Sequence, residues 1–398
     1  MNIPQSNNIV RVKILDTTTY LTGVAQIFIK PVVKGHETLS FYDVAFLIEH
    51  DGLGKKAMFD LGTRKDYWNL APAIQMVFGS DTAMTGMRID KEVSEILEEG
   101  GVALDSIDYC IWSHFHYDHC GNMSPFPPST SIVMGSGFKS ADILPGYPEN
   151  PKSPVLASDF ANRRIEQVDF SGDLTIGGFR AYDFFGDGSL YLLDSPGHCA
   201  GHICALARTT PSSHENGASF MLLGGDISHF PGHFRPTPAL PFPDTIPASA
   251  VLRRTDHRLP PVCPCSLFAD HHPNASDQSV TRETPWYDLP GEWPTAYENP
   301  ETARSSVLSL QEMDGDENVL VCLAHDAALL DVLPVFNKEP GKDCNDWREN
   351  GWKQECHWGW LNEIPIDGQP AHPPLVDGFW RDGKKWDYDS FKKQLFAS

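Results

Sequence analysis

Residues 107–122 read Ile-Asp-Tyr-Cys-Ile-Trp-Ser-His-Phe-His-Tyr-Asp-His-Cys-Gly-Asn, an apolar strand-like run that leads directly into a dense histidine cluster. Imidazole nitrogen and carboxylate oxygen are ligands suited to Zn²⁺ and neighbouring transition metals. In an extended segment His114 and His116 face the same way, because side chains alternate between the two faces. Asp118 and His119 need a turn to join them, and Gly121 supplies the flexibility for one. We therefore expect a metal site directly after this strand.

The H-x-H-x-D-H motif after an apolar strand resembles the signature of the metallo-β-lactamase-fold hydrolases. Later stretches resemble the remaining motifs of that family in the same order. Residues 194–198, Asp-Ser-Pro-Gly-His, are similar to the turn that carries a third histidine. Residues 222–226 are similar to the strand that ends in a bridging aspartate, and residues 319–326 to the last strand, which ends in a histidine. Asp60 lies where the family has an aspartate near the site.

The resemblance implies an α+β fold, an αββα sandwich with a dinuclear metal site at the edge of the paired sheets. It also implies two Zn²⁺ ions, although other divalent transition metals suit the same ligands. The implied ligands of one ion are His114, His116 and His198, those of the other are Asp118, His119 and His325, and Asp226 bridges the two. We interpret His202 as a structural neighbour of this set.

The bridging aspartate separates lactonase-type and glyoxalase II-type hydrolases from true zinc β-lactamases, which generally lack an acid there. The resemblance thus predicts a dinuclear zinc hydrolase, in which a metal-bridging hydroxide opens a lactone or lactam ring. Asp118 is expected to orient this nucleophile and to pass a proton to the leaving group. His229 replaces a tyrosine that contacts the substrate carbonyl in N-acyl homoserine lactone lactonases. It is predicted to be catalytic, with simple packing beside the site as the alternative.

Aromatic residues near the motifs suggest a hydrophobic or aromatic ring, such as a benzoxazolinone-like fused γ-lactam. The expected lining is Phe115, Tyr117, Phe230 and Phe234, with residues 229–236 at the mouth of the pocket. The alternative function is a glyoxalase II-like thioesterase, for which Lys384-Lys385 and Lys392-Lys393 are weak candidates to bind a glutathione carboxylate. A metal-binding scaffold that has lost catalysis is a third hypothesis.

The composition restricts the class of partner. The chain has 398 residues, with 53 acidic and 31 basic side chains, and its formal net charge is −22. This balance disfavours binding to nucleic acid or to an anionic membrane surface, and it favours a small-molecule substrate. The first residues lack the pattern of a secretory signal, and no apolar run reaches the roughly 20 residues of a membrane span. We predict a cytoplasmic enzyme whose nine cysteines are reduced.

One domain over residues 1–398 accounts for the length, with a Pro-rich insertion at about 231–300 and a Trp-rich C-terminal extension at about 340–398 that packs onto the body. Helices are predicted at Asp90–Glu99, capped by Asp90, and at Glu301–Met313, with Leu308 on its buried side. Strands are predicted at residues 9–15, 24–29, 44–48, 56–62, 107–112, 131–134, 179–184, 190–194, 203–207, 220–223 and 318–323.

Overall fold

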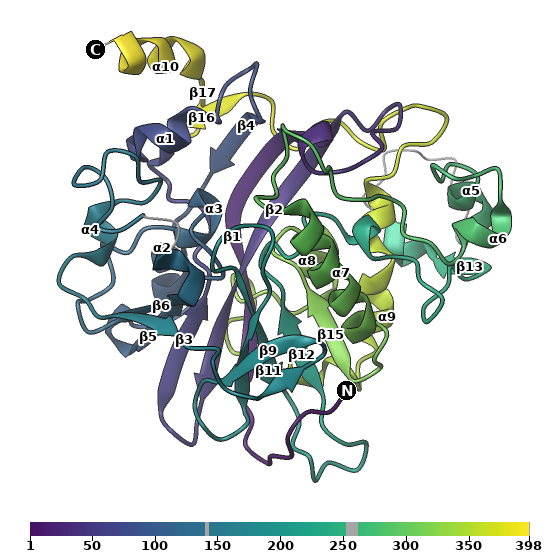
Figure 1. Cartoon of the computed structure of the whole chain (residues 1–398), viewed down its shortest axis with the longest axis horizontal. Coiled ribbons are helices and arrows are strands. Elements are labelled where there is room, and N and C mark those ends of the chain that lie inside the picture. The colour runs from purple at the N-terminus through teal and green to yellow at the C-terminus, as the bar shows by residue number, and fades with distance from the viewer. Residues whose placement is uncertain (140–142, 252–261, 398) are drawn as a thin grey trace.

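A computed structural model describes residues 1–139, 143–251 and 262–397 of the chain (Figure 1). Within these residues, nine strands form one mixed sheet in the order β17-β16-β4-β1-β2-β3-β5-β6-β7. Their bounds are β1 (Arg11–Val24), β2 (Thr38–His50), β3 (Lys55–Phe59), β4 (Met84–Ile89), β5 (Tyr109–Ile111), β6 (Ser131–Gly135), β7 (Ile165–Val168), β16 (Phe379–Arg381) and β17 (Lys384–Trp386). The strands β3, β5, β6 and β7 run parallel to one another.

A second sheet stacks against the first. In the described part of the chain it has six strands in the order β15-β12-β11-β10-β9-β8. Their bounds are β8 (Thr175–Ile176), β9 (Phe179–Asp183), β10 (Leu190–Asp194), β11 (Ile203–Arg208), β12 (Phe220–Leu223) and β15 (Val319–Cys322). Because β12 and β15 are parallel, their carboxyl ends lie at the same edge of the sheet.

Most of the α-helices are short. They are α1 (Pro72–Gln75), α2 (Val93–Glu99), α3 (Tyr117–Cys120), α4 (Ala157–Phe160), α5 (Cys265–Ala269), α6 (Gln278–Thr281), α7 (Pro300–Asp314), α8 (Ala327–Val332), α9 (Trp352–His357) and α10 (Tyr388–Ala397). Helix α2 covers the outer face of the first sheet and α7 covers that of the second.

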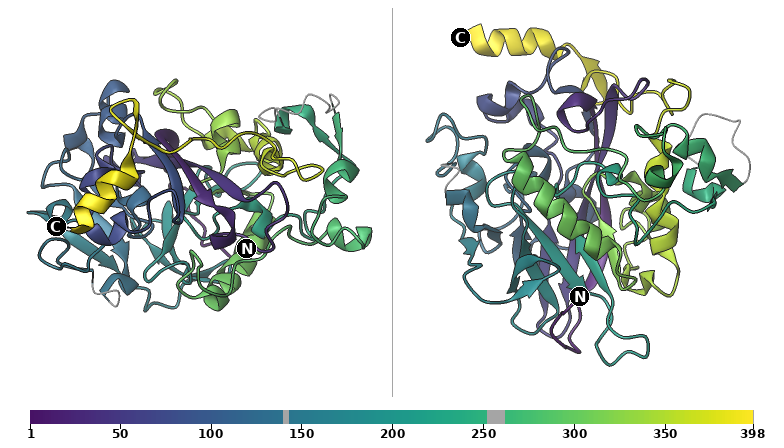
Figure 2. Two further views of the ribbon diagram at one scale, coloured as in Figure 1. Left: turned by 90° about the horizontal axis from the view of Figure 1, so that it is seen from above. Right: turned by 45° about the vertical axis from the view of Figure 1, so that its right-hand side comes forward.

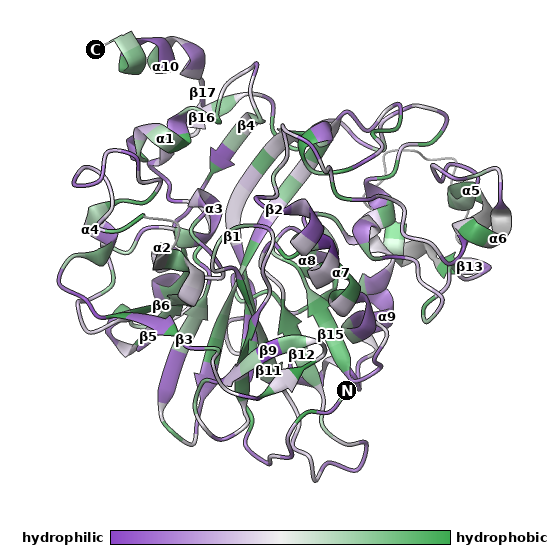
Figure 3. Ribbon diagram, in the orientation of Figure 1, coloured by the Kyte–Doolittle hydropathy of each residue, from purple (hydrophilic) through white to green (hydrophobic). Residues whose placement is uncertain are grey.

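Alternating side chains of each strand fill different layers of the molecule. In β2, Ile48 faces the space between the sheets, in one apolar cluster with Leu192 of β10. Leu47 faces the opposite way, in the cluster beneath α2. Leu193 likewise points outward, in the cluster beneath α7. Figure 3 shows hydrophobic residues along β15, of which Leu320 and Cys322 belong to the cluster between the sheets. The layers therefore stack as an αββα sandwich, and the predicted α+β fold class is confirmed.

Three of the predicted strands differ clearly from the structure, and one of these is the strand at 44–48, which extends over Thr38–His50 as β2. β1 extends well beyond the predicted 9–15, because the polar residues after Leu15 continue the strand through an irregularity between Asp16 and Tyr20. The hydroxyl of Thr17 donates to the carbonyl of Asp43 at 2.8 Å, which satisfies a polar group inside the sheet. The predicted strand at 24–29 is wrong, since the chain forms a 3₁₀ turn over Ala25–Ile27 there.

The predicted helices exist, but two details were wrong. Glu92, not Asp90, caps α2: its side chain accepts from the backbone of Glu95, whose carboxylate accepts from the backbone N–H of Glu92 at 2.8 Å. The backbone N–H of Asp90 instead donates to the carbonyl of Thr18, at the irregularity within β1. In α7, Leu308 is 61% exposed, because it lies about 100° around the helix from the buried Val307.

The region of the predicted insertion holds a separate pair of strands, β13 (Thr245–Pro247) and β14 (Val262–Pro264). The C-terminal extension packs onto the body as predicted. Trp347 is buried and donates to the hydroxyl of Thr209 at 3.2 Å, and β16 pairs with β4 at the edge of the large sheet. Figure 2 shows α10 at one end of the molecule. The boundaries of the single domain, its insertion and its extension stay predictions.

No helix of the described ranges is long and apolar enough to cross a membrane. The described cysteines form no disulfide and are all buried: Cys110, Cys120, Cys199, Cys204, Cys322, Cys344 and Cys356. Cys263 and Cys265 lie outside the side chains that the structure describes. The cytoplasmic location stays a prediction.

A buried ion pair joins the region of the predicted insertion to α7, and a further bond joins it to the C-terminal extension. Arg235 is 4% exposed, and its guanidinium donates to both carboxylate oxygens of Asp314 at 2.8 and 3.0 Å. A third bond at 3.2 Å reaches the carbonyl of His357 in α9. Burial alone raises the pKa of Asp314, but the adjacent Arg235 prevails and lowers it to about 2.

We expect Asp314→Asn to lower the free energy of unfolding by about 3–5 kcal/mol at pH 7, because it leaves Arg235 buried without its partner. The pKa of this carboxyl is depressed in the folded protein, so the stabilisation is present above the ordinary value of 3.8 and is lost as the pH falls towards 2. Urea denaturation of both proteins across this range measures the difference. Lys385→Ala removes an exposed pair with Asp377 and should cost less than about 1 kcal/mol. Equal effects of the two variants would contradict this account.

Candidate metal centre

Loops at one edge of the two sheets carry the predicted ligands. Asp60 follows β3, and the histidine cluster follows β5 and enters α3. His198 lies between β10 and β11, Asp226 follows β12, and His325 follows β15. Since β3 and β5 are parallel, as are β12 and β15, the ends of these strands converge. The fold thus brings together residues that are more than 200 positions apart in the chain.

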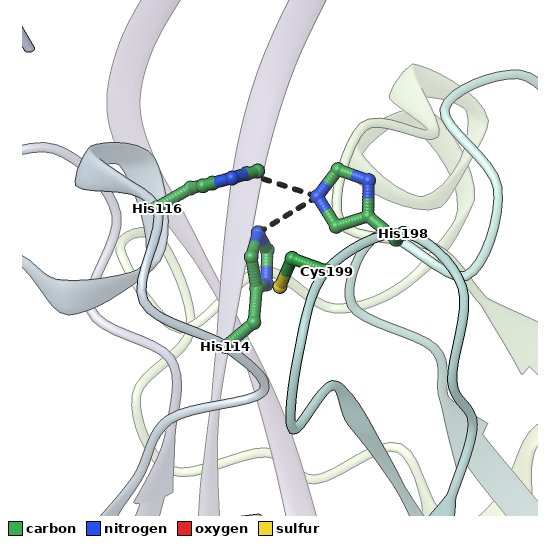
Figure 4. Close-up of side chains that lie close together, drawn as sticks. All are labelled: His114, His116, His198 and Cys199. Atoms are coloured by element: carbon green, nitrogen blue, oxygen red, sulfur yellow. Dashed lines mark hydrogen bonds between the residues drawn. The ribbon is translucent and has the colours of Figure 1, made fainter. Parts of the chain in front are cut away.

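Three imidazoles form the first donor set, His114, His116 and His198 (Figure 4). Nε2 of His198 lies 3.1 Å from Nε2 of His114 and 2.9 Å from Nδ1 of His116. Cys199 is close to these residues, but Figure 4 shows its sulfur directed away from the point where the three nitrogens meet. The set therefore consists of nitrogen atoms.

The second donor set consists of Asp118, His119 and His325, and the carboxylate of Asp226 lies between the two sets. Its Oδ1 is 3.2 Å from Nε2 of His119 and 3.1 Å from Nε2 of His325. Its Oδ2 is 3.6 Å from Nε2 of His198 in the first set. Asp118 is more distant, with carboxylate oxygens 3.9 Å from each of the two histidines of its set. Each oxygen of Asp226 thus faces a different set.

The donor chemistry fits a divalent transition metal. Four ligands at the usual Zn–N distance lie roughly 3.3 Å from one another in a tetrahedron, close to the separations found in the first set. Nitrogen lone pairs that face each other repel unless a proton or a cation lies between them. Nε2 of His119 and Oδ1 of Asp226 are buried. Although they lie 3.2 Å apart, neither has a hydrogen-bond partner among the described residues. A bound cation would satisfy these atoms, which otherwise carry the cost of burial.

The histidines of the two sets differ in protonation, because burial prevails in the first set and negative charge, above all that of Asp226, prevails in the second. Burial lowers the pKa of His116 to about 3 and holds those of His114 and His198 well below their usual range, so these imidazoles present free lone pairs. Burial also opposes protonation of His119 and His325, but the carboxylate of Asp226 raises their pKa well above the usual value.

The pKa values of Asp118 and Asp226 are shifted in opposite directions. Burial raises the pKa of Asp118 to about 7. Burial also opposes ionisation of Asp226, but His119 and His325 outweigh it and hold its pKa well below the usual range. The second set therefore carries protons in the metal-free protein that a metal ion must displace.

Two further aspartates orient the histidines of the second set. Asp60 accepts from the backbone N–H and the hydroxyl of Ser113 at 2.7 and 2.8 Å, and it lies 2.8 Å from Nδ1 of His119. It does so at a φ of +60°, a left-handed conformation that few residues other than glycine adopt. Asp43 lies 2.9 Å from Nδ1 of His325, and the carbonyl oxygen of Tyr42 lies 3.1 Å from the same nitrogen. Sequence reasoning missed Asp43, although one acid within the apolar run of β2 was a usable signal.

His202 is a structural neighbour of the site. Its Nε2 accepts from the backbone N–H of Asp226 at 3.0 Å, and its Nδ1 lies 2.8 Å from the hydroxyl of Ser195. Both nitrogens are occupied by the protein itself, so His202 holds the loop after β12 in place.

A cavity of about 390 Å³ opens above the donor sets. Its walls are mainly apolar, and the described lining residues include no lysine or arginine. They are Ile27, Phe28, Phe41, Ile74, Met76, Val77, Thr82, Ala83, Met84, His116, Tyr117, Asp118, His198, Asp226, His229, Trp293, Pro294, Thr295, Ala296 and His325. Trp293 is 88% exposed, so that much of its ring is free to contact a ligand at the mouth.

The predicted lining was mostly wrong. Tyr117 lines the cavity, but Phe115 packs against Phe138 with ring centroids 5.6 Å apart, facing the opposite side of its loop. Phe234 is buried in the cluster beneath α7, and Phe230 packs with Trp360 behind the site. The expected mouth at residues 229–236 is wrong for the same reason, because after His229 this stretch turns into the core.

His229 lies where the sequence placed it, beside Asp226. Its Nε2 is 3.2 Å from Oδ2 of Asp226 and its Nδ1 is 2.8 Å from the hydroxyl of Tyr297. Tyr297 was not predicted, and no motif marks it, since it lies in the region of lost periodicity.

Comparison with known proteins agrees with this geometry. The family model described as "Metallo-beta-lactamase superfamily" matches residues 42–209. The chain is 39% identical over 378 residues to "Gamma-lactamase FDB1" of Fusarium pseudograminearum (strain CS3096), covering 92% of this chain and 85% of that protein. It is 36% identical over 365 residues to "Metallo-hydrolase mfmC" of Annulohypoxylon moriforme, covering 92% and 90%.

The fold is also similar to a solved N-acyl homoserine lactone hydrolase with the product N-hexanoyl-L-homoserine bound at its catalytic metal center. The TM-score is 0.51 at 16% identity, and the match covers 83% of this chain and 98% of that one. The chain therefore belongs to the metallo-β-lactamase superfamily, as the order of its motifs predicted. It is a hydrolase of the metallo-β-lactamase type.

Asp60→Asn should weaken zinc binding about 10- to 100-fold, because the amide replaces the carboxylate that orients His119. Competition with a chromophoric chelator measures the affinity, and circular dichroism monitors the fold. Asp382→Asn is the matched control, since Asp382 also has a positive φ, of 50°, but its side chain is 80% exposed. Unchanged affinity in Asp60→Asn would show that this contact has no part in metal binding.

Proposed function

We propose that the protein opens a cyclic amide or cyclic ester, a lactam or lactone with a hydrophobic or aromatic ring system. One observation carries this proposal: a carboxylate shared by two donor sets lies at the floor of an apolar cavity. The names of the relatives, a gamma-lactamase and a metallo-hydrolase, support the same class of reaction. The absence of lysine and arginine from the described lining favours a substrate without a carboxylate.

The centre is proposed to be dinuclear and to hold zinc. His114, His116 and His198 would bind one ion, Asp118, His119 and His325 the other, and Asp226 both. Support comes from the division of Asp226, whose two oxygens face different donor sets. Other divalent transition metals satisfy the same donors.

Divalent ions in such a centre activate water as a nucleophile and polarise a carbonyl oxygen. The apolar walls of the cavity bind the ring and exclude bulk water from the reacting carbonyl. Asp118 lines both the cavity and the second donor set. We assign a proton transfer to Asp118. It takes the proton that the attacking water loses and gives it to the ring nitrogen or oxygen, which leaves when the acyl bond breaks.

The thioesterase alternative depends on lysines that, among the described residues, lie outside the cavity lining. Lys385 pairs with Asp377 at 2.6 Å, and Lys392 donates to the carbonyls of Met76 and Phe78. Neither lysine lines the cavity in the described part of the chain. The relatives' names also favour lactam or lactone hydrolysis.

A panel of ring substrates tests the proposal. The zinc-loaded protein should open a benzoxazolinone or an acylated γ-lactone and leave a glutathione thioester intact. Asp226→Asn should reduce kcat more than about 100-fold, because changing even an outer partner of a metal ligand commonly costs 10- to 100-fold. Asp169→Asn, on the surface, is the control and should match the wild type. Hydrolysis of the thioester alone would favour the alternative.

Trp293→Ala should raise KM for an aryl lactam about fivefold and leave kcat within about threefold. The indole offers apolar contact area at the mouth but touches neither donor set, and a ring contact of this kind is worth about 1 kcal/mol. Steady-state kinetics separate the two constants. Leu308→Ala removes an exposed apolar residue outside this cavity and should change neither one. A fall in kcat with KM unchanged would place Trp293 in the chemistry instead.

A further inference from the structure

His229 and Tyr297 meet behind the shared carboxylate, although 68 positions separate them. The tyrosine hydroxyl lies 2.8 Å from Nδ1 of His229, and the other ring nitrogen, Nε2, lies 3.2 Å from Oδ2 of Asp226. His229 is 5% exposed and Tyr297 2%, so water does not compete freely for these contacts. The imidazole therefore bridges a phenol and a carboxylate.

The two partners determine where the imidazole proton lies. An ionised carboxylate can only accept hydrogen bonds, so Nε2 must supply a proton to Asp226. A neutral imidazole carries one N–H, which leaves Nδ1 as an acceptor for the hydroxyl proton of Tyr297. The opposite arrangement would place a bare lone pair of Nε2 against the negative oxygen of Asp226.

Backbone contacts hold the tyrosine in place. We call residues 293–299 the strap. Within it, the N–H of Ala296 donates to the carbonyl of Ile27 at 2.9 Å, and the N–H of Glu298 donates to the carbonyl of His198 at 2.8 Å. Trp293 at the other end of the strap lines the cavity. The strap therefore connects the cavity wall, the first donor set and the partner of His229.

A rival role for His229 is that of a metal ligand. Donor atoms of His198, Asp226 and His229 lie within 4.8 Å of one another, which is close enough for a common cation. A ligand imidazole must present a nitrogen without a proton. When Tyr297 donates to Nδ1, the proton of His229 stays on Nε2, the nitrogen that faces the centre, so a metal ion could bind there only by displacing that proton and reversing the hydrogen bond with Tyr297.

We propose that Tyr297 is a positioning residue that keeps His229 as an N–H donor in the site, where it stays outside the metal ligand set. His229 donates to Asp226, and it donates to the carbonyl oxygen of a bound ring when negative charge develops there. This second role rests on the proposed hydrolysis of a cyclic amide or ester, whereas the first does not.

The ligand question is tested without substrate. The metal-free wild type and His229→Gln are loaded with Co²⁺, the metal content is measured, and the visible absorption spectra are compared. Glutamine keeps an N–H donor but is a poor replacement for a histidine ligand. We expect equal metal content and superimposable spectra. Loss of cobalt or a shifted spectrum in His229→Gln would identify His229 as a ligand and overturn the proposal.

Kinetics test the donor role. Tyr297→Phe and His229→Ala should each reduce kcat about 10- to 100-fold with KM within about threefold, whereas His229→Gln should recover most of the activity. Tyr182→Phe, on an exposed strand position, is the matched control and should leave both constants unchanged. Unchanged kcat in Tyr297→Phe, with circular dichroism like the wild type, would overturn the positioning role.

The two proposals fail in different ways. A wild-type protein that opens no ring on the panel contradicts the proposed function and with it the donation to a substrate. The cobalt spectrum of His229→Gln still decides between ligand and donor to Asp226 in that case.

Discussion

The site depends on one buried negative charge. The carboxylate of Asp226 is 2% exposed, and taking such a group out of water costs several kcal/mol unless opposite charge and hydrogen bonds compensate for it. Its surroundings are built for that compensation. His119 and His325 face one oxygen, while His198 and His229 face the other. The strands β5, β10, β12 and β15 all end at this edge, so the sandwich fixes the positions from which the compensating groups come.

Further contacts orient the imidazoles that face Asp226 and hold the loop that carries it. Asp60 and Asp43 lie against the Nδ1 atoms of His119 and His325, which directs their Nε2 atoms towards Asp226. His202 holds the loop of Asp226 by its backbone. On the opposite side, Tyr297 plays the corresponding part for His229. His119, His325 and His229 are thus each held by a partner at the other nitrogen, whereas Nδ1 of His198 has no partner among the described residues.

The sequence predicted the donor residues better than it predicted their surroundings. The H-x-H-x-D-H motif and the strand-end residues His198, Asp226 and His325 are local patterns, each attached to a short apolar strand that can be recognised alone. The structure brings all of these side chains together. The αββα sandwich was implied by the resemblance that these motifs carry, while β1 was cut short because its continuation is polar and irregular.

The cavity could not be predicted in this way. Its walls come from Phe28 and Phe41 near the start of the chain and from Trp293 near residue 300, and no periodic pattern connects such distant segments. Neighbours of a motif in sequence can point away from it: Phe115 packs against Phe138, and Phe234 lies in the cluster beneath α7. Tyr297 was missed for the same reason, since its role exists only once the strap crosses His229.

The shared carboxylate is tested most directly by anomalous X-ray diffraction from crystals of the zinc-loaded protein, measured on both sides of the zinc absorption edge. If Asp226 is shared by two ions, two anomalous peaks are expected about 3.5–4 Å apart, each next to a different oxygen of Asp226. A single peak, or two peaks of which one lies out of reach of Asp226, would contradict this sharing.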